Sequence, residues 1–237
     1  MSACRTILTL LLLAAAPPDV PVEPTDDFQP KPSWKALGPS LWFDPEGKRL
    51  IVRARVALRE GPLEHLLCLK GTKEHEAVLA TPAAPRQIHA GLLLTGAEPG
   101  HPIRFLPKFI PPSGSPIGIE LHWTEAGKPR RADAREWVKD ERGGTTLTTD
   151  WVFAGSELYV DPTTKTTIYA ADDGDLITVA NFASSILDLP FASTADDAGR
   201  TFVANTVHIP PRGTPVTMFF RPRPRPAPTP PKRRAAP

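Results

Sequence analysis

The stretch LIVRARVAL at residues 50–58 alternates apolar and basic side chains from Val52 onward. The residues at 52, 54, 56 and 58 fall on one side of an extended chain, whereas Arg53 and Arg55 fall on the other. A period of two residues is typical of a β-strand with one buried face. The stretch therefore predicts a half-buried strand.

Five further runs have the composition and boundaries of strands. They lie at residues 63–69, 117–123, 151–154, 167–170 and 176–179. The last two are separated by DDGD at residues 172–175, and Asp-Gly is a strong signal for a two-residue hairpin. We expect a turn there rather than a calcium loop, because the alternate acids and the distant Glu of a calcium loop are absent.

One amphipathic helix is predicted in the first half of the chain. Pro82 and Pro85 stand at its start, where a missing N–H does little harm, and Thr81 can cap it. Apolar residues then recur at helical spacing until Gly96, which can end the helix. Gly91 within it costs about 1 kcal/mol relative to Ala, which predicts that a strand passes close by.

The composition supports a fold built mainly from strands. Thirty of the 237 residues are Pro, which excludes a helical bundle, a coiled coil and a multi-pass membrane protein. The hydrophobic fraction of 41% is enough to bury a core, so wholesale disorder is excluded as well. We therefore expect a mainly β domain with one helix (α+β), as a β-sandwich or a partly open barrel.

The two ends of the chain differ from the middle. Residues 1–16 combine an early Arg, a short apolar run and a small-residue exit, which is typical of a secretory signal peptide and too short for a membrane span. Residues 17–39 hold seven Pro and read as a linker, and residues 221–237 hold seven more and read as a disordered tail. We expect residues 40–220 to form the domain of a periplasmic or secreted protein without a transmembrane anchor in its mature form.

The positive charge of the chain is concentrated in its tail. Residues 221–237 carry six basic and no acidic residues. Without these six and Arg5, residues 17–220 hold 21 basic against 26 acidic residues, so they offer no basic face for nucleic acid. The tail could bind an anionic envelope polymer through its charge, or it is simply solvated.

The densest polar cluster is CLKGTKEHE at residues 68–76, which is followed by His89 on the predicted helix. A thiol, imidazoles and a carboxylate are donors that zinc or copper accepts. Cys68, His75, Glu76 and His89 are therefore candidate metal ligands. Their spacing is a weaker argument for a metal site than their residue types, because no two of Cys68, His75 and His89 are close enough in sequence to nucleate metal binding.

Three other interpretations use the same residues. In the first, Cys68 is a small buried hydrophobic residue beside a structural His–Glu corner. In the second, the cluster is a ligand pocket without catalysis. Alternatively, Cys68 and one of the two His form a nucleophilic pair, although no local signature marks one. With only two Cys in the chain, a disulfide-stapled scaffold and a four-cysteine zinc or iron–sulfur site are excluded.

The chain also resembles a known family. The motifs that carry the likeness are CLKGTKEHE at 68–76, HAGLLLTGAEPG at 89–100, WVFAGS at 151–156, NF at 181–182, LDLP at 187–190 and IPPRGTPV at 209–216. Together they resemble the YdjY-domain family of bacterial exported proteins, over roughly residues 40–220. The likeness draws attention to Lys73 besides the four candidate ligands but implies no role for them. Some relatives have ferredoxin-like names, but the cysteine quartet of a cluster is missing here.

The remaining candidates are interpreted as structural. Trp123, Trp137 and Trp151 lie on or beside predicted strands, where a place in the core is favoured over a stacking platform. His65 and His122 are interpreted as surface or satisfied structural residues. No Gly-x-Ser-x-Gly, His-Glu-x-x-His or Walker motif occurs.

The leading hypothesis from the sequence is therefore an exported, non-catalytic binding or structural module of the cell envelope. A metal-binding or redox protein that uses the Cys/His/Glu cluster is the second hypothesis, and a Cys/His hydrolase is the third.

Overall fold

The computed structural model describes residues 28–193 and 202–224. The predicted signal peptide at 1–16 and most of the predicted tail lie outside these residues. The strands and helices have the following bounds: β1 (Lys35–Gly38), β2 (Leu41–Asp44), β3 (Arg49–Val56), β4 (His65–Leu69), β5 (Ala77–Thr81), α1 (Pro85–Leu94), β6 (Pro116–Glu125), β7 (Lys128–Asp133), η1 (Ala134–Trp137), β8 (Val138–Asp140), β9 (Trp151–Phe153), β10 (Leu158–Val160), β11 (Thr167–Tyr169), η2 (Ala170–Asp173), β12 (Asp175–Thr178), β13 (Leu187–Asp188), β14 (Phe202–Ala204) and β15 (Pro215–Pro222).

The first predicted strand forms β3, but it is more deeply buried than its pattern predicts. Val52, Ala54 and Val56 face the core as expected. Arg53, on the opposite face, is only 8% exposed, because its guanidinium donates to Oγ1 of Thr217 and lies under the ring of Phe28. Thr217 and Phe28 thus cover Arg53 on the face of the strand that the alternation predicts to be exposed.

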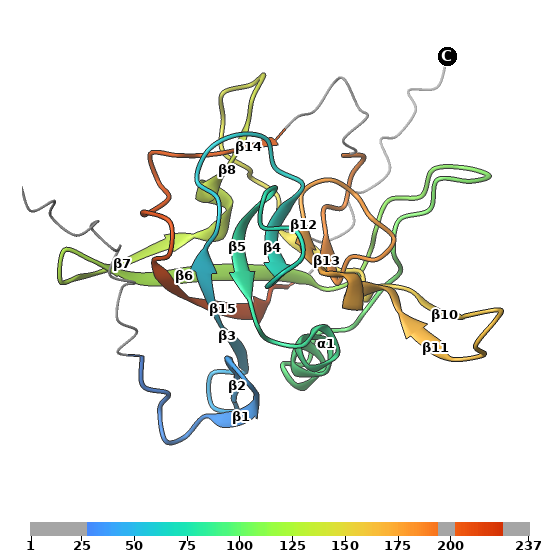
Figure 1. Ribbon diagram of the computed structural model, residues 1–237, viewed down its shortest axis with the longest axis horizontal. Coiled ribbons are helices and arrows are strands. Elements are labelled where there is room, and N and C mark those ends of the chain that lie inside the picture. Colours follow the sequence, from blue (N-terminus) through green and yellow to red (C-terminus); the bar gives the residue numbers. More distant parts are fainter. Residues whose placement is uncertain (1–27, 194–201, 225–237) are drawn as a thin grey trace, which may run out of the picture.

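Eight strands close into a barrel in the order β3, β15, β6, β9, β13, β12, β4 and β5 (Figure 1). The ring closes because β2 and β5 share one edge of β3: β2 pairs with its first half, and β5 pairs with Arg55 and Val56. The β4–β5 and β12–β13 pairs are parallel. The expectation of a mainly β fold with one α-helix is confirmed. The barrel is closed rather than partly open, and no sandwich is seen among the described residues.

The helix α1 packs at one end of the barrel against β2 and β3, to the right of β3 and beneath β5 in Figure 1. Pro85 lies in its first turn and Gly96, with a φ of +85°, follows its end, as predicted. Gly91 faces Leu50 of β3 so closely that a Cβ would collide with that side chain, which confirms the predicted close approach. Thr81 does not cap the helix, because the helix begins at Pro85 with Ala84 in the N-cap position; the Thr81 hydroxyl donates to the carbonyl of Arg53 and accepts from the amide of Ala83.

Two further expectations need correction. The segment at 172–175 is not a hairpin: β11 pairs with β10, whereas β12 pairs with β4 and β13, and the short helix η2 connects them through Gly174 at a φ of +116°. The fold also begins before residue 40. Within the predicted linker, β1 pairs with β2, and the ring of Phe28 packs in a tilted arrangement against Trp34 and Trp42.

The core fills the barrel and its flanks. Trp137 and Trp151 are buried, and Trp123 packs edge-on against Trp137 at 5.4 Å, so the prediction that these residues are structural is confirmed. No helix within residues 28–193 and 202–224 is long and apolar enough to cross a lipid bilayer.

Candidate functional site

The four predicted metal ligands do not come together. Cys68 is buried in β4, and burial raises the pKa of its thiol to about 11. The side chain of His75 is 76% exposed, and its nearest acidic partner is Glu76, at 3.6 Å. His89 lies on α1, away from both. Within the described residues, only Glu76 of the four belongs to a group of three or more closely spaced metal-binding side chains.

His89 has a structural role. Its Nδ1 lies 2.8 Å from the hydroxyl of Tyr169, which itself donates to the carbonyl of Gly155. Its ring also packs edge-on against Phe153 at 4.9 Å. Burial lowers the pKa of His89. The helix therefore directs this imidazole into the junction with β9 and β11, not toward the loop that carries His75.

The group that does form consists of Glu64, His65 and Glu76, which we call the carboxylate–histidine cluster. One ligand atom from each residue lies within 4.8 Å of the others. The parallel pairing of β4 with β5 brings them together, because His65 is in register with Ala77 and the carbonyl of Glu76 accepts from the amides of Glu64 and His65. The cluster therefore stands where the two strands begin.

Asp175 of β12 fixes the orientation of the histidine. Nε2 of His65 lies 2.8 Å from Oδ1 of Asp175, and the same oxygen accepts from Nζ of Lys73 at 2.6 Å. Ser184 donates to the other carboxylate oxygen. Burial alone would raise the pKa of Asp175, but the hydrogen bonds from His65, Lys73 and Ser184 lower it well below its usual range. Asp175 is therefore an ionised acceptor that keeps the proton of His65 on Nε2.

The other ring nitrogen of His65, Nδ1, differs from Nε2 in its surroundings. The residue is fully buried, and no described residue forms a hydrogen bond with its Nδ1. The nearest carboxylate oxygen, Oε1 of Glu76, lies 3.9 Å away, which is too far for a hydrogen bond. With the proton on Nε2, Nδ1 presents a lone pair toward the partly exposed carboxylate of Glu76, and a cation held between these two acceptors would satisfy both.

The charges around the cluster point the same way. Three carboxylates, from Glu64, Glu76 and Asp175, lie near one lysine, Lys73, and Glu76 also lies 3.6 Å from the exposed imidazole of His75. Burial and the nearby charge of Glu76 raise the pKa of Glu64. Lys73 is bound to Asp175 and lies over the ring of Phe182, and its charge also lowers the pKa of Glu64. Glu64 and Glu76 are partly open to solvent, which leaves a route for an ion to enter.

Sequence reasoning found Glu76 but missed Glu64, His65 and Asp175. For Glu64 and His65 the sequence does contain a pattern that could have drawn attention to them: the dipeptide Glu-His occurs at 64–65 and again at 74–75. The sequence predicts a surface or a satisfied structural residue at His65; the first is wrong because the residue is fully buried, and the second describes only its Nε2 side. Asp175 lies 110 residues further along the chain, and no sequence pattern links it to His65.

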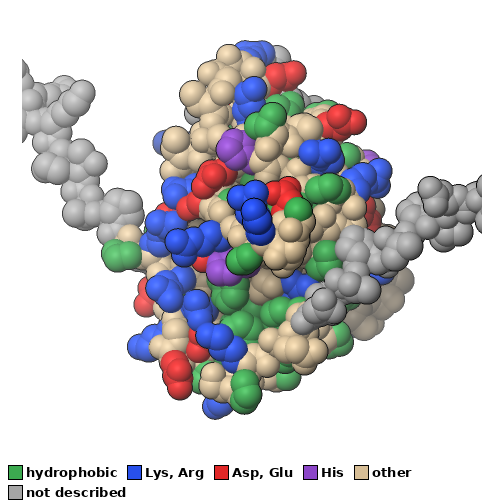
Figure 2. Space-filling view, turned by 90° about the vertical axis from the view of Figure 1, so that its left-hand side faces the viewer, with side chains coloured by type: hydrophobic (Ala, Val, Ile, Leu, Met, Phe, Trp, Pro, Cys, Tyr) green, Lys and Arg blue, Asp and Glu red, His purple; other side chains and the backbone are tan. Residues whose placement is uncertain are grey.

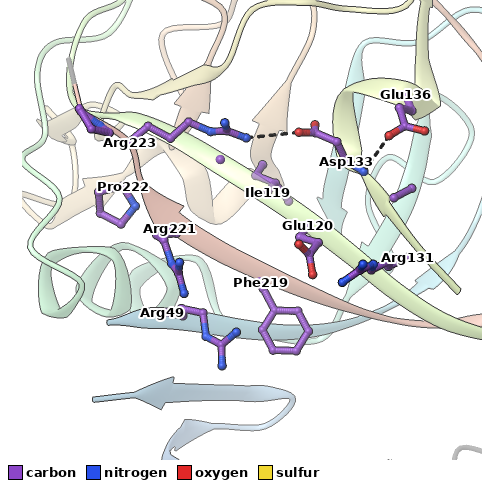
Figure 3. Close-up of a pocket in the computed structure, with 13 residues that line it drawn as sticks. Arg49, Ile119, Glu120, Arg131, Asp133, Glu136, Phe219, Arg221, Pro222 and Arg223 are labelled. Carbon is purple, nitrogen blue, oxygen red and sulfur yellow. Dashed lines mark hydrogen bonds and ion pairs between the residues drawn. The ribbon is translucent and has the colours of Figure 1, made fainter. Parts of the chain in front are cut away.

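A second polar surface lies on the outer face of β15, β6 and β7. A groove of about 570 Å³ runs there, and Figure 3 shows Arg223 reaching across to Asp133. Arg49 is paired with Asp44 at 2.6 Å and lies 5.0 Å from the ring of Phe219. The charged residues that line the groove are Arg49, Arg131, Arg221, Arg223, Glu120, Asp133 and Glu136.

This groove is a surface of mixed charge. Arg223 also pairs with Asp150 at 3.2 Å, and Glu120 is bound to His122. Figure 2, a view of the side from which the β6–β7 hairpin projects, likewise shows Lys and Arg side chains interspersed with acids. Since carboxylates already neutralise two of the four arginines, we place the candidate site at the carboxylate–histidine cluster rather than in the groove.

The comparisons with known proteins identify a family and nothing more specific. A family model described as the YdjY domain matches residues 41–221. No curated protein and no solved structure matches the chain.

Proposed function

The chain belongs to the YdjY-domain family, and on that premise we propose that it is an exported, non-catalytic binding module that holds a divalent metal ion between Glu64, His65 and Glu76. The observation that carries the proposal is the buried Nδ1 of His65, which has no hydrogen-bond partner within residues 28–193 and 202–224 and lies 3.9 Å from the carboxylate of Glu76. Export rests on the sequence of residues 1–16.

Zinc fits the donor set best. One imidazole nitrogen and two carboxylate oxygens are a combination that Zn²⁺ accepts, whereas copper in its reduced form prefers thiolates. The thiol of Cys68 is not part of the cluster. Because Asp175 holds Nε2–H of His65, the arrangement is the carboxylate–histidine–metal triad found around many protein-bound zinc ions.

Three protein ligands leave at least one coordination position open. Both glutamates face solvent, so water or a donor atom of a further ligand can occupy that position. The ion could therefore exchange with solvent through this open position. The redox and hydrolase alternatives depend on Cys68, and a buried thiol with a raised pKa speaks against both.

Metal binding by purified protein tests the proposal. The full chain, prepared without a histidine tag, is stripped with chelator and titrated with Zn²⁺ by calorimetry. We expect one site per chain, and we expect Glu76→Gln to weaken binding by about tenfold or more. Glu74→Gln is the matched control: it lies in the same turn, where its carboxylate accepts from the amide of Gly71 outside the cluster.

Thermal melts of the metal-free proteins show whether each variant is folded. The proposal would be contradicted if the unchanged chain bound less than one zinc ion per chain. It would also be contradicted if Glu74→Gln and Glu76→Gln weakened zinc binding equally. Elemental analysis of protein taken directly from metal-replete cells then shows which ion it carries.

A further inference from the structure

A loop between α1 and β6 presents eight consecutive exposed residues. Residues 104–111 read RFLPKFIP, and the loop extends from the right-hand side of the barrel in Figure 1. Arg104 and Ile110 exchange backbone hydrogen bonds of 3.0 and 2.8 Å, which close the loop at its base. We call residues 104–111 the apolar tip.

Large apolar side chains dominate this tip. Leu106 is 85% exposed and Phe105 50%, and Phe109 and Ile110 are each 38% exposed. The rings of Phe105 and Phe109 contact each other edge-on, so the tip has a defined shape. A contiguous group of exposed aromatic and aliphatic side chains on a protruding loop marks a surface that binds something.

The charges on the tip indicate what it binds. Arg104 and Lys108 are its charged residues, and residues 99–119 contain no Asp or Glu. Lysine is depleted at the centre of protein–protein interfaces, yet Lys108 lies between Pro107 and Phe109. At a bilayer, by contrast, a lysine stem can lie along apolar groups while its ammonium reaches the lipid headgroups.

We propose that the apolar tip docks the protein on an anionic lipid surface. Phe105, Leu106 and Phe109 enter the boundary between headgroups and acyl chains, and Arg104 and Lys108 contact lipid phosphates. Apolar burial supplies the attachment, and the two cations supply the preference for anionic lipid.

The β10–β11 hairpin is a second exposed apolar segment, but its charges differ from those of the apolar tip. It also exposes Leu158, Tyr159 and Val160. However, Glu157 and Asp161 flank these residues, and an anionic surface would repel both. We therefore assign lipid contact to the apolar tip alone.

A local probe tests the docking. In the full chain carrying Cys4→Ser, Leu106→Cys is labelled with a nitrobenzoxadiazole dye, while Cys68 is buried and stays unlabelled. With vesicles of phosphatidylcholine and phosphatidylglycerol we expect the emission to rise several-fold and to shift to the blue. The matched control is the same label at Val207→Cys, whose native side chain is 88% exposed outside the tip and should report no change.

Charge selectivity is tested on the same labelled protein. Adding Lys108→Glu should weaken partition into anionic vesicles by about tenfold. Vesicles of phosphatidylcholine alone should bind less of the labelled protein than the anionic vesicles do. Equal binding to both kinds of vesicle would overturn the anionic part of the proposal.

Two further results would overturn the docking itself. The apolar run at residues 7–13 or the basic tail could bring the chain to vesicles, and the protein would then sediment with them without any change at residue 106. A change at residue 106 without vesicles that grows with protein concentration would identify a second copy of the chain as the partner.

Discussion

Nε2 of His65 lies 2.8 Å from Oδ1 of Asp175, and on the far side of the same ring Nδ1 is buried without a hydrogen-bond partner among the described residues. The first contact fixes which nitrogen carries the proton, and the second leaves a directed lone pair. Asp175 is thus a positioning residue for the candidate site, which makes it the first target for mutation.

Asp175→Asn should weaken zinc binding by about 10- to 100-fold, because an amide can neither hold the Nε2–H tautomer as firmly nor raise the basicity of Nδ1. Calorimetry measures the loss, and ¹⁵N NMR of the His65 ring shows whether the tautomer has changed. Asp172→Asn is the control, since that surface carboxylate pairs with Arg86. Unchanged zinc affinity in Asp175→Asn would mean that His65 does not ligate the ion.

Zinc uptake should release protons and should weaken as the pH falls. Burial and the charge of Glu76 raise the pKa of Glu64, so this carboxyl holds its proton at a higher pH than an ordinary glutamate, and any proton that it holds must leave before it binds zinc. Calorimetry in buffers of different ionisation enthalpy counts these protons. Glu64→Gln should release fewer protons than the unchanged chain, and an equal count would assign them to another group.

The contribution of Asp188 to stability should become less favourable as the pH rises from about 4 to about 7. This carboxyl is fully buried; its Oδ1 accepts from Asn181 and from the amide of Leu189, and its Oδ2 has no partner among the described residues. Burial raises its pKa from 3.8 to about 7. Between these values the unfolded chain has lost the proton and the folded chain retains it, so folding is disfavoured progressively, by on the order of a few kcal/mol.

Asp188→Asn should flatten this dependence. Urea denaturation at several pH values should give similar free energies of unfolding for the two proteins near pH 4 and a more stable variant at pH 8. The exposed Asp173→Asn serves as the control and should follow the unchanged chain. If the free energy of unfolding depended on pH in the same way for Asp188→Asn and the unchanged chain, Asp188 would not titrate between about pH 4 and pH 7.

Cys68 should react slowly. With a thiol pKa of about 11, the thiolate fraction at pH 7 is lower than that of an ordinary cysteine by on the order of 100-fold, and the side chain is also buried. Alkylation by iodoacetamide, followed by mass spectrometry, should therefore modify Cys68 only after unfolding in guanidinium. Rapid alkylation of the folded protein would revive the interpretation of Cys68 as a nucleophile.

The features that the sequence determined by itself are local ones. The alternation at residues 50–58 predicted β3, and Pro85 and Gly96 marked the ends of α1, because backbone preferences act within a few residues. The cost of Gly91 inside a helix even predicted its contact with a strand, now identified as β3 through Leu50.

The tertiary structure alone decided the site. Cys68, His75 and His89 are close in sequence, but strand burial, solvent exposure and helix packing direct them to three different environments. Glu64, His65 and Glu76 meet because β4 and β5 run parallel in register, and Asp175 joins them from a residue 110 positions away only through the pairing of β12 with β4. Which side chains meet across strands depends on register and ring closure, and these are set by the packing of the whole barrel rather than by any one segment.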